Sequence, residues 1–342
     1  MTIFLYSCTI TSLKLFDGVL MKLVYFFAVV LGVMGLISCK QSTPKTTVTI
    51  GIIEPVEHTA MNSIVAGFAE NLHKIYQKPV VIKIENAQND PNLQRAIIQK
   101  MAAAEYDMLV PIGVATTQMT LAMVHNKPVI SLAANISDQD RQHLAPHCNV
   151  AVVHDEISIR QLLGFIHAVY PQLTNLSLVH SAADKVLPEV QAAVAAGKEY
   201  GITIKPVMVT TLPELYTVAQ ALPAQTQGIV ILKDVMIVSG ISTLAKTAAD
   251  RHIPLITSDQ GSVQDGAGFA LGVHEREIGV SGATLAAGVL NGEEACNLPI
   301  VNMEKLTVFM NAHALVQSGQ DIQTVTDAAT QAGFNNEMIG ET

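Results

Sequence analysis

The feature that most constrains the fold is a regular alternation of short apolar runs with segments of helical length. The first run, residues 48–53 (VTIGII), has no polar alternation, which is typical of a strand buried on both faces. A helical pattern follows at 60–76, where Ile64, Phe68 and Leu72 fall on one stripe. Strands that alternate with helices predict βαβ units and parallel sheets. The sequence therefore predicts an α/β fold.

The same cycle repeats along the chain in two series. In the first series, further strands are expected at 80–84, 108–112 and 129–132, with helices at 91–104 and 115–125. In the second series, strands are expected at 150–153, 176–179, 204–209, 229–232 and 255–257. Two series of this length predict two doubly wound, Rossmann-like lobes.

The N-terminal region carries a signal of its own. Lys22 precedes a short apolar run that ends at Leu36-Ile37-Ser38-Cys39. A cationic start, a short apolar run and small residues before a cysteine are typical of a secretory signal peptide. The alternative is a transmembrane helix, but the uncharged run is only about 16 residues, short of the roughly 20 that a span needs. We therefore expect residues 1–38 to comprise an upstream extension (1–20) and a signal peptide that is removed, with the start codon at either Met1 or Met21, and 39–47 to form a polar tether.

Charge and motifs exclude several classes of function. The chain has 20 basic and 29 acidic residues, a net charge of -9 and no Lys/Arg cluster, so we expect no nucleic-acid partner. It has no Walker A sequence, no Gly-x-Ser-x-Gly elbow and no dinucleotide-binding glycine fingerprint. His143 and His147 lie four apart, but Pro146 between them breaks the helix that would aim both at one metal. We expect neither an enzyme nor a bound cofactor or metal.

Candidate binding residues lie where predicted strands end, because ligands of open α/β sheets bind at the carboxyl ends of the strands. These candidates are Glu57, His58, Gln88, Ala115, Thr116, Thr117, Asn135, Asp155, Asp234, Ser258 and Asp259.

Four short motifs carry a resemblance to a known family. They are residues 56–60 (VEHTA), 86–90 (NAQND), 148–155 (CNVAVVHD) and 253–259 (IPLITSD). Together with the strand order from about 50 to 314, they resemble ABC-transporter substrate-binding proteins with the type 1 periplasmic-binding fold, whose characterised members take up aromatic and other apolar amino acids. The chain departs from the family pattern at pocket positions, notably Ala115, Asn135 and Lys233, which leaves the identity of the ligand open.

The resemblance implies a ligand with a carboxylate and an ammonium, and burying either group unpaired costs several kcal/mol. The helix that begins with Ala115, Thr116 and Thr117 offers N–H groups and hydroxyls to the carboxylate, although ordinary helix capping is the alternative. Asp234 and Asp259 could hold the ammonium, or could cap helices. Asp155 could be a further acceptor for the ammonium, or could lie in a solvated turn or cap a helix. Glu57 and His58 would face the cleft, where His58 could contact the ligand or merely cap the next helix. Lys233 would either neutralise Asp234 or recognise an acidic group of the ligand.

The resemblance also implies two lobes that close around the ligand about a multi-strand hinge. We expect one lobe from 48–149 plus about 273–299, and the other from 150–272 plus about 300–342. Crossings are expected near 149–152, 271–273 and 298–301. Cys148 and Cys296 each precede a crossing and could pair in an oxidising envelope, but we favour the interpretation as two separate buried thiols.

The function implied is that of the extracytoplasmic component of an ABC importer. Such a protein captures a small solute, here an aromatic or apolar amino acid, and delivers it to the permease subunits. The Leu-x-Ser-Cys ending resembles a bacterial lipobox, which implies a lipid on Cys39 and attachment to a membrane of the cell envelope, on the periplasmic side in a Gram-negative cell. The alternative is a ligand-sensing lipoprotein of the same fold that signals to a membrane partner.

Overall fold

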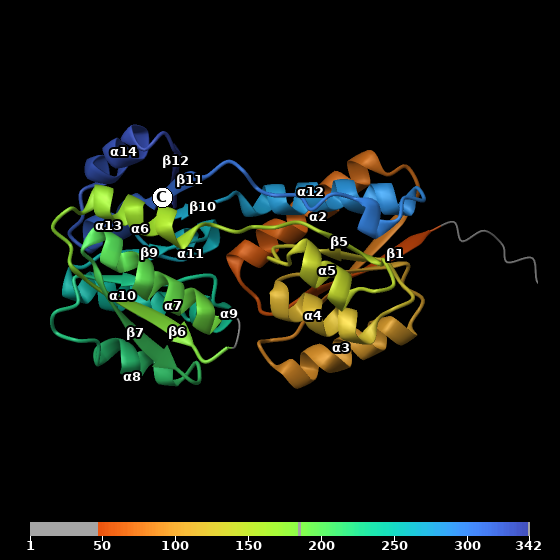
Figure 1. Cartoon of the computed structure of the whole chain (residues 1–342), viewed down its shortest axis with the longest axis horizontal. Helices are drawn as coiled ribbons and strands as arrows, with labels where there is room; N and C mark the ends of the chain where they lie inside the picture. Colours follow the sequence, from red (N-terminus) through yellow and green to blue (C-terminus); the bar gives the residue numbers. More distant parts are fainter. Residues whose placement is uncertain (1–46, 184–185, 341–342) are drawn as a thin grey trace, which may run out of the picture. The chain divides into compact units, whose positions relative to one another are not determined.

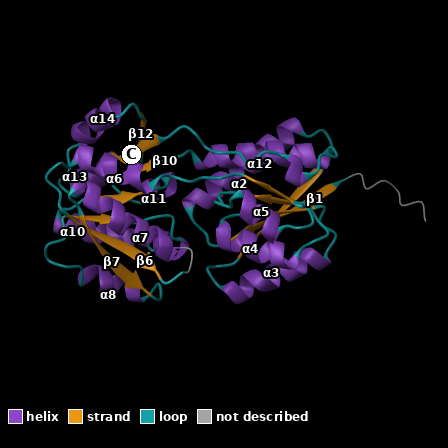
Figure 2. Cartoon of the chain, in the orientation of Figure 1, coloured by secondary structure: helices purple, strands orange, loops and turns teal. Residues whose placement is uncertain are grey.

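The structure, a computed structural model, describes residues 47–183 and 186–340. These residues form two sheets of mostly parallel strands with helices on their faces, as Figures 1 and 2 show, and they confirm the predicted α/β fold. The predicted signal peptide, Cys39 and nearly all of the tether lie outside the described residues. No helix in the described part of the chain is long and apolar enough to cross a membrane.

The first sheet has five parallel strands in the order β2-β1-β3-β4-β5. The strands are β1 (Val48–Glu54), β2 (Val80–Asn86), β3 (Met108–Pro111), β4 (Val129–Ser131) and β5 (Val150–Val152). Its helices are α2 (Thr59–Ile75), α3 (Pro91–Ala103), α4 (Val114–Met123), α5 (Asp138–Leu144) and α12 (Glu275–Leu290). Side chains of β1 alternate between two cores: Ile52 packs with α2 and α12, whereas Ile53 packs with α3. This two-sided burial explains the continuous apolar run in the sequence.

The second sheet has seven strands in the order β12-β11-β10-β9-β8-β6-β7. The strands are β6 (Asn175–Ser181), β7 (Thr203–Val209), β8 (Gly228–Val230), β9 (Leu255–Thr257), β10 (Phe269–Gly272), β11 (Thr307–Asn311) and β12 (Asn335–Ile339). Its longer helices are α6 (Ile159–Val169), α7 (Val186–Gly197), α10 (Ile241–Arg251) and α14 (Ile322–Gln331). Its shorter helices are α8 (Glu214–Gln220), α9 (Val235–Val238), α11 (Gln260–Gln264) and α13 (Ala312–Gln317).

Two details of the topology differ from the prediction. β5 pairs in parallel with β4, with Val129 opposite Val150, so the first lobe extends through β5 and the predicted boundary at residue 150 is wrong. β10 and β11 are antiparallel, whereas the other strand pairs among the described residues are parallel. The chain leaves the second sheet at the end of β10, forms α12 on the first lobe and then returns. Because β11 enters the sheet from the end at which β10 leaves, the two strands run in opposite directions.

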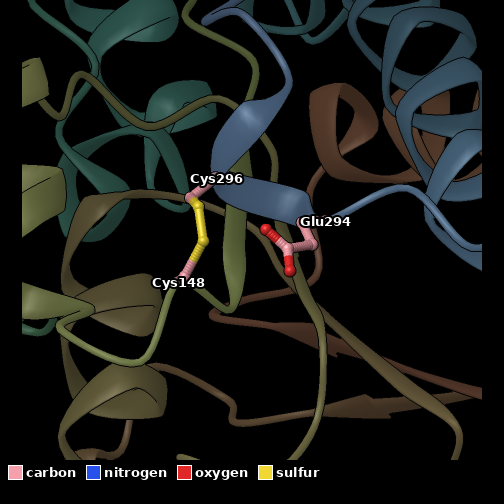
Figure 3. A group of neighbouring side chains, drawn as sticks. All are labelled: Cys148, Glu294 and Cys296. Carbon is pink, nitrogen blue, oxygen red and sulfur yellow. A yellow bond between two sulfur atoms is a disulfide. The ribbon is translucent and has the colours of Figure 1, made fainter.

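Cys148 and Cys296 form a disulfide with 4.9 Å between their Cα atoms, and the interpretation as two separate thiols is therefore wrong (Figure 3). The bond does not join the two lobes. It attaches the short 3-10 helix η2 (Ala295–Asn297), which contains Cys296, to Cys148, which lies just before Asn149 and β5. The sequence could not show this pairing because it depends on the chain's return beside β5, where Val301 bridges to Val153.

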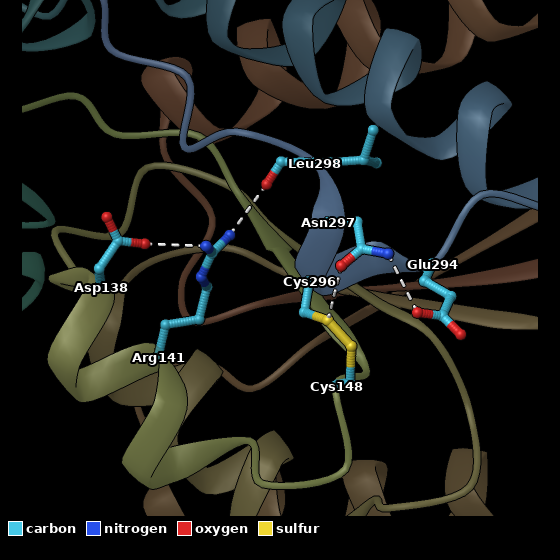
Figure 4. The surroundings of a disulfide bond; sticks show 7 residues. All are labelled: Asp138, Arg141, Cys148, Glu294, Cys296, Asn297 and Leu298. Atoms are coloured by element: carbon cyan, nitrogen blue, oxygen red, sulfur yellow. Dashed lines mark hydrogen bonds and ion pairs between the residues drawn. A yellow bond between two sulfur atoms is a disulfide. The ribbon is translucent and has the colours of Figure 1, made fainter.

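Arg141 contacts the segment that returns beside β5, which contains Cys296 and Leu298, at a second point (Figure 4). Its guanidinium donates to the carbonyl oxygen of Leu298 at 2.9 Å and pairs with Asp138 at 2.8 Å. Cys148, Cys296 and Glu294 are the only described residues grouped as metal ligands could be, and the two sulfur atoms are already bonded to each other.

Candidate functional site

Two adjoining cavities lie at the ends of the strands and share Asp155 and Lys233. The interlobe cavity has a volume of about 60 Å³ and is lined from both sheets by Pro55, His58, Ala60, Met61, Ile64, Gly113, Ala133, Asp155, Lys233, Val235, Val238, Asp259, Glu275 and Ile278. The larger cavity, about 290 Å³, is lined by Asn135, Asp155, Glu156, Ile157, Ser158, Ile159, Leu162, Glu189, Ala192, Leu232, Lys233 and Ser258.

His58 lies at the wall of the interlobe cavity and caps α2. Its Nδ1 accepts a hydrogen bond from the backbone N–H of Ala60 at 3.2 Å, and its Nε2 lies 3.4 Å from a carboxylate oxygen of Asp265. Thr59 donates to the same carboxylate at 2.9 Å. The neighbouring Glu57 is exposed and lines neither cavity.

The start of α4 reaches the interlobe cavity through its backbone and not through its threonines. Thr116 donates to Gln94 at 3.2 Å, and Thr117 donates to the carbonyl oxygen of Gly113 at 2.8 Å. Both hydroxyls are buried inside the first lobe, and Ala115 lines neither cavity. Gly113, the residue before the helix, lines the cavity with a φ of 85° that favours glycine. Only the N–H groups at this helix start are therefore available to an anion.

The two aspartates expected to hold an ammonium have different surroundings. Asp234 caps α9, and its carboxylate accepts from the backbone N–H groups of Ser181 (2.6 Å) and Met236 (3.2 Å). It lines neither cavity. Asp259 caps α11 by accepting from the N–H and the hydroxyl of Ser262, at 2.7 and 2.8 Å, and it also lines the interlobe cavity.

Asp155 and Lys233 form an ion pair that lines both cavities. The ammonium nitrogen lies 2.5 Å from Oδ2 of Asp155 and also donates to its carbonyl oxygen at 2.7 Å. Lys233 therefore neutralises Asp155, and the expectation that it neutralises Asp234 is wrong. Asn135 accepts from the N–H of Asp155 at 3.4 Å.

Ser258 is a further predicted residue that lines the larger cavity. Gln88 lies away from both cavities. It is exposed, has a φ of 51° and donates its N–H to Asn86 at 2.8 Å in a turn.

Glu275 lines the interlobe cavity and is missing from the predicted set. The residue is 4% exposed, and its Oε1 accepts from the N–H groups of Gln260 (2.6 Å) and Gly261 (3.3 Å). Burial, and then the charge of Asp259, raise the pKa of Glu275 to about 8, while Lys233 acts in the opposite direction. Glu275 follows β10 by three residues, so the strand-end rule would have found it had that strand been included.

This carboxyl group predicts a pH dependence of stability. Its ordinary pKa is 4.5 but the folded chain raises the pKa to about 8, so the folded state binds an extra proton between these values. The stability that this proton contributes is complete below about pH 4.5 and is lost as the pH rises through 8. We expect the melting temperature of the ligand-free chain to fall more steeply over this window than that of a Glu275→Gln variant. Parallel melting profiles would contradict this.

Comparisons with known proteins agree with this architecture. The family model for ABC transporter substrate binding proteins matches residues 49–333. An uncharacterized protein of Rickettsia prowazekii (strain Madrid E) is 36% identical over 275 residues, which cover 80% of this chain and 86% of that protein. A tyrosine-binding protein of Clostridioides difficile is 25% identical over 287 residues, which cover 81% of this chain and 82% of that protein.

Solved structures share the fold. A conserved domain protein from Vibrio cholerae has a TM-score of 0.76 at 21% identity, covering 86% of this chain and all (100%) of that one. A Streptococcus pneumoniae protein in complex with L-Trp has a TM-score of 0.74 at 19% identity, and the match covers 82% of this chain and 98% of that one. Both the family and the fold are those of solute-binding proteins and not of enzymes. The chain belongs to the family of ABC transporter substrate-binding proteins, which work outside the cytoplasm.

Proposed function

We propose that this chain is the solute receptor of an ABC importer and that it captures a free amino acid with an aromatic or apolar side chain. The observation that carries the proposal is the placement of opposite binding groups around one cavity. Asp259 lines it with a carboxylate, Asp155 lines it with a carboxylate that is already paired with Lys233, and Gly113 brings the N-terminus of α4 to the same space. A helix N-terminus favours a carboxylate, and carboxylates favour an ammonium, so the pair is complementary to an amino acid.

The larger cavity offers a place for the side chain of the ligand. Ile157, Leu162 and Leu232 give it an apolar wall, and it adjoins the interlobe cavity at Asp155. The interlobe cavity of about 60 Å³ holds only about two water molecules, so the main-chain end of a ligand would need a small separation of the walls. The tyrosine-binding relative and the neighbour in complex with L-Trp support an amino acid as the ligand.

The test is a calorimetric titration of the chain with apolar and aromatic amino acids. We expect Asp259→Asn to weaken binding roughly tenfold to a hundredfold, because it removes one charge-assisted partner of the ammonium. Asparagine still caps a helix, so α11 is preserved. Asp321→Asn is the matched control, because Asp321 caps α14 and lines neither cavity. The affinity of this variant for the amino acid should equal that of the wild type.

A different ligand class would change the proposal. If no amino acid binds but a polyol or sugar does, the amino-acid assignment fails while the receptor role stands. Uptake of labelled amino acid in cells lacking the chain separates transport from sensing: lost uptake supports an importer, and normal uptake favours a sensor. We also propose that lipid on Cys39 anchors the mature chain, which the mass of its N-terminal peptide would test.

A further inference from the structure

The carboxyl group of Glu275 has one satisfied and one unsatisfied oxygen. Oε1 accepts two backbone hydrogen bonds at the start of α11, whereas Oε2 is buried and has no hydrogen-bond partner among the described residues. Native proteins rarely leave a buried polar atom unpaired, because it loses its hydration without compensation. Glu275 lines the interlobe cavity, so a molecule bound there is placed to supply the missing donor.

The charged and titratable groups that face Glu275 come from four other elements. They are His58 at the start of α2, Asp155 after β5, Lys233 after β8 and Asp259 at the start of α11. Lys233 is paired with Asp155, and the Nε2 of His58 faces Asp265. Among the described residues, neither Asp259 nor Glu275 takes part in a salt bridge. The cavity therefore has acidic groups in excess of cationic ones.

We propose that Oε2 of Glu275 accepts a hydrogen bond from a positively charged nitrogen of the ligand, and that Glu275 thereby makes the cavity select ammonium compounds over neutral or acidic ones. This inference rests on the proposed function, since the ammonium of an amino acid is the expected donor. It adds Glu275 to the binding residues. It also predicts that a ligand must carry a cationic group to bind, whatever its other groups are.

Binding should also release a proton. Burial and Asp259 raise the pKa of Glu275 to about 8, so this carboxyl is mostly protonated at neutral pH before a ligand binds. A ligand cation at hydrogen-bond distance favours the ionised form, and the displaced proton passes to the buffer. By linkage, affinity rises with pH up to about 8, by at most tenfold per pH unit for one proton released.

The experiment is calorimetry of the full-length chain in detergent, at about pH 6, 7 and 8 and in two buffers of different ionisation enthalpy. The probes are L-phenylalanine, phenethylamine, which keeps only the ammonium, and N-acetyl-L-phenylalanine, which keeps only the carboxylate. We expect the first two to bind with proton release and the third to fail. Glu275→Gln should weaken binding roughly tenfold to a hundredfold and abolish the proton release. Glu277→Gln, an exposed acid on the same helix, should change neither.

Each outcome decides the matter. If phenylalanine binds equally to the wild type and to Glu275→Gln, with the same proton count, this inference falls and the amino-acid receptor stands. If only the amine binds and Glu275 is needed, the inference stands and the amino-acid assignment falls. Binding of the acetylated probe alone, or of none, overturns both. Should Glu275→Gln fold poorly, the proton count of the wild type alone decides, because zero release at pH 7 contradicts the proposal.

Discussion

Replacing both Cys148 and Cys296 by serine should lower the free energy of unfolding by about 4 kcal/mol. The two residues are 148 positions apart, so the bond closes a long loop and removes many conformations from the unfolded chain. The expected loss is a large fraction of the stability of an ordinary domain. Denaturant titration of both proteins without reductant measures it.

Reduction supplies the control for this prediction. Reductant should lower the midpoint of the wild type toward that of the double serine variant and leave the variant unchanged. Arg141 still bonds to Leu298 in the variant, so we expect the returning segment to stay in place and ligand affinity to change little. A thiol titration that finds Cys148 and Cys296 free in the non-reduced protein would contradict the prediction.

The fold was predictable wherever a strand is buried on both faces. In β8, Ile229 packs into one core and Val230 into the core on the other side, so both positions must be apolar and the run stands out in the sequence. β12 (Asn335–Ile339) gives no such signal. β12 is one of the two edge strands of its sheet, three of its five residues are exposed, and its polar sequence looks like a loop.

The candidate site was less predictable because local sequence does not show which way a side chain faces. Asp234 and Asp259 both follow a buried strand and both cap a short helix, yet only Asp259 lines a cavity. Thr116 and Thr117 likewise point into their own lobe. These differences depend on how each helix packs. The sequence therefore identifies the strand ends that form the site. It does not show which of the polar residues at those ends reach the cavity.

Adding a methyl group at Gly279 of α12 should destabilise the chain by about 3 kcal/mol, although glycine to alanine within a helix usually gains up to about 1 kcal/mol. A Cβ at this position would lie 2.0 Å from the carbonyl oxygen of Ile64 and 2.6 Å from the N atom of Phe68, both in the backbone of α2. A Cβ added at Gly67 of α2 would likewise lie 2.1 Å from the backbone carbonyl oxygen of Arg276 in α12. The two helices thus touch backbone to backbone, and neither contact has a flexible side chain that could yield.

The matched control is Gly288→Ala in the same helix. Its added Cβ would meet only the carboxylate end of Glu293, at 3.1 Å, which can move aside, so stability should be unchanged or slightly higher. Denaturant titration of Gly279→Ala and Gly288→Ala compares them directly, and equal stability would contradict close packing of α2 on α12. Because Glu275 begins α12 and His58 caps α2, a forced separation of these helices also moves two walls of the interlobe cavity. Gly279→Ala should therefore weaken ligand binding without touching the ligand, since this helix contact fixes the position of the acidic group that the proposed site requires.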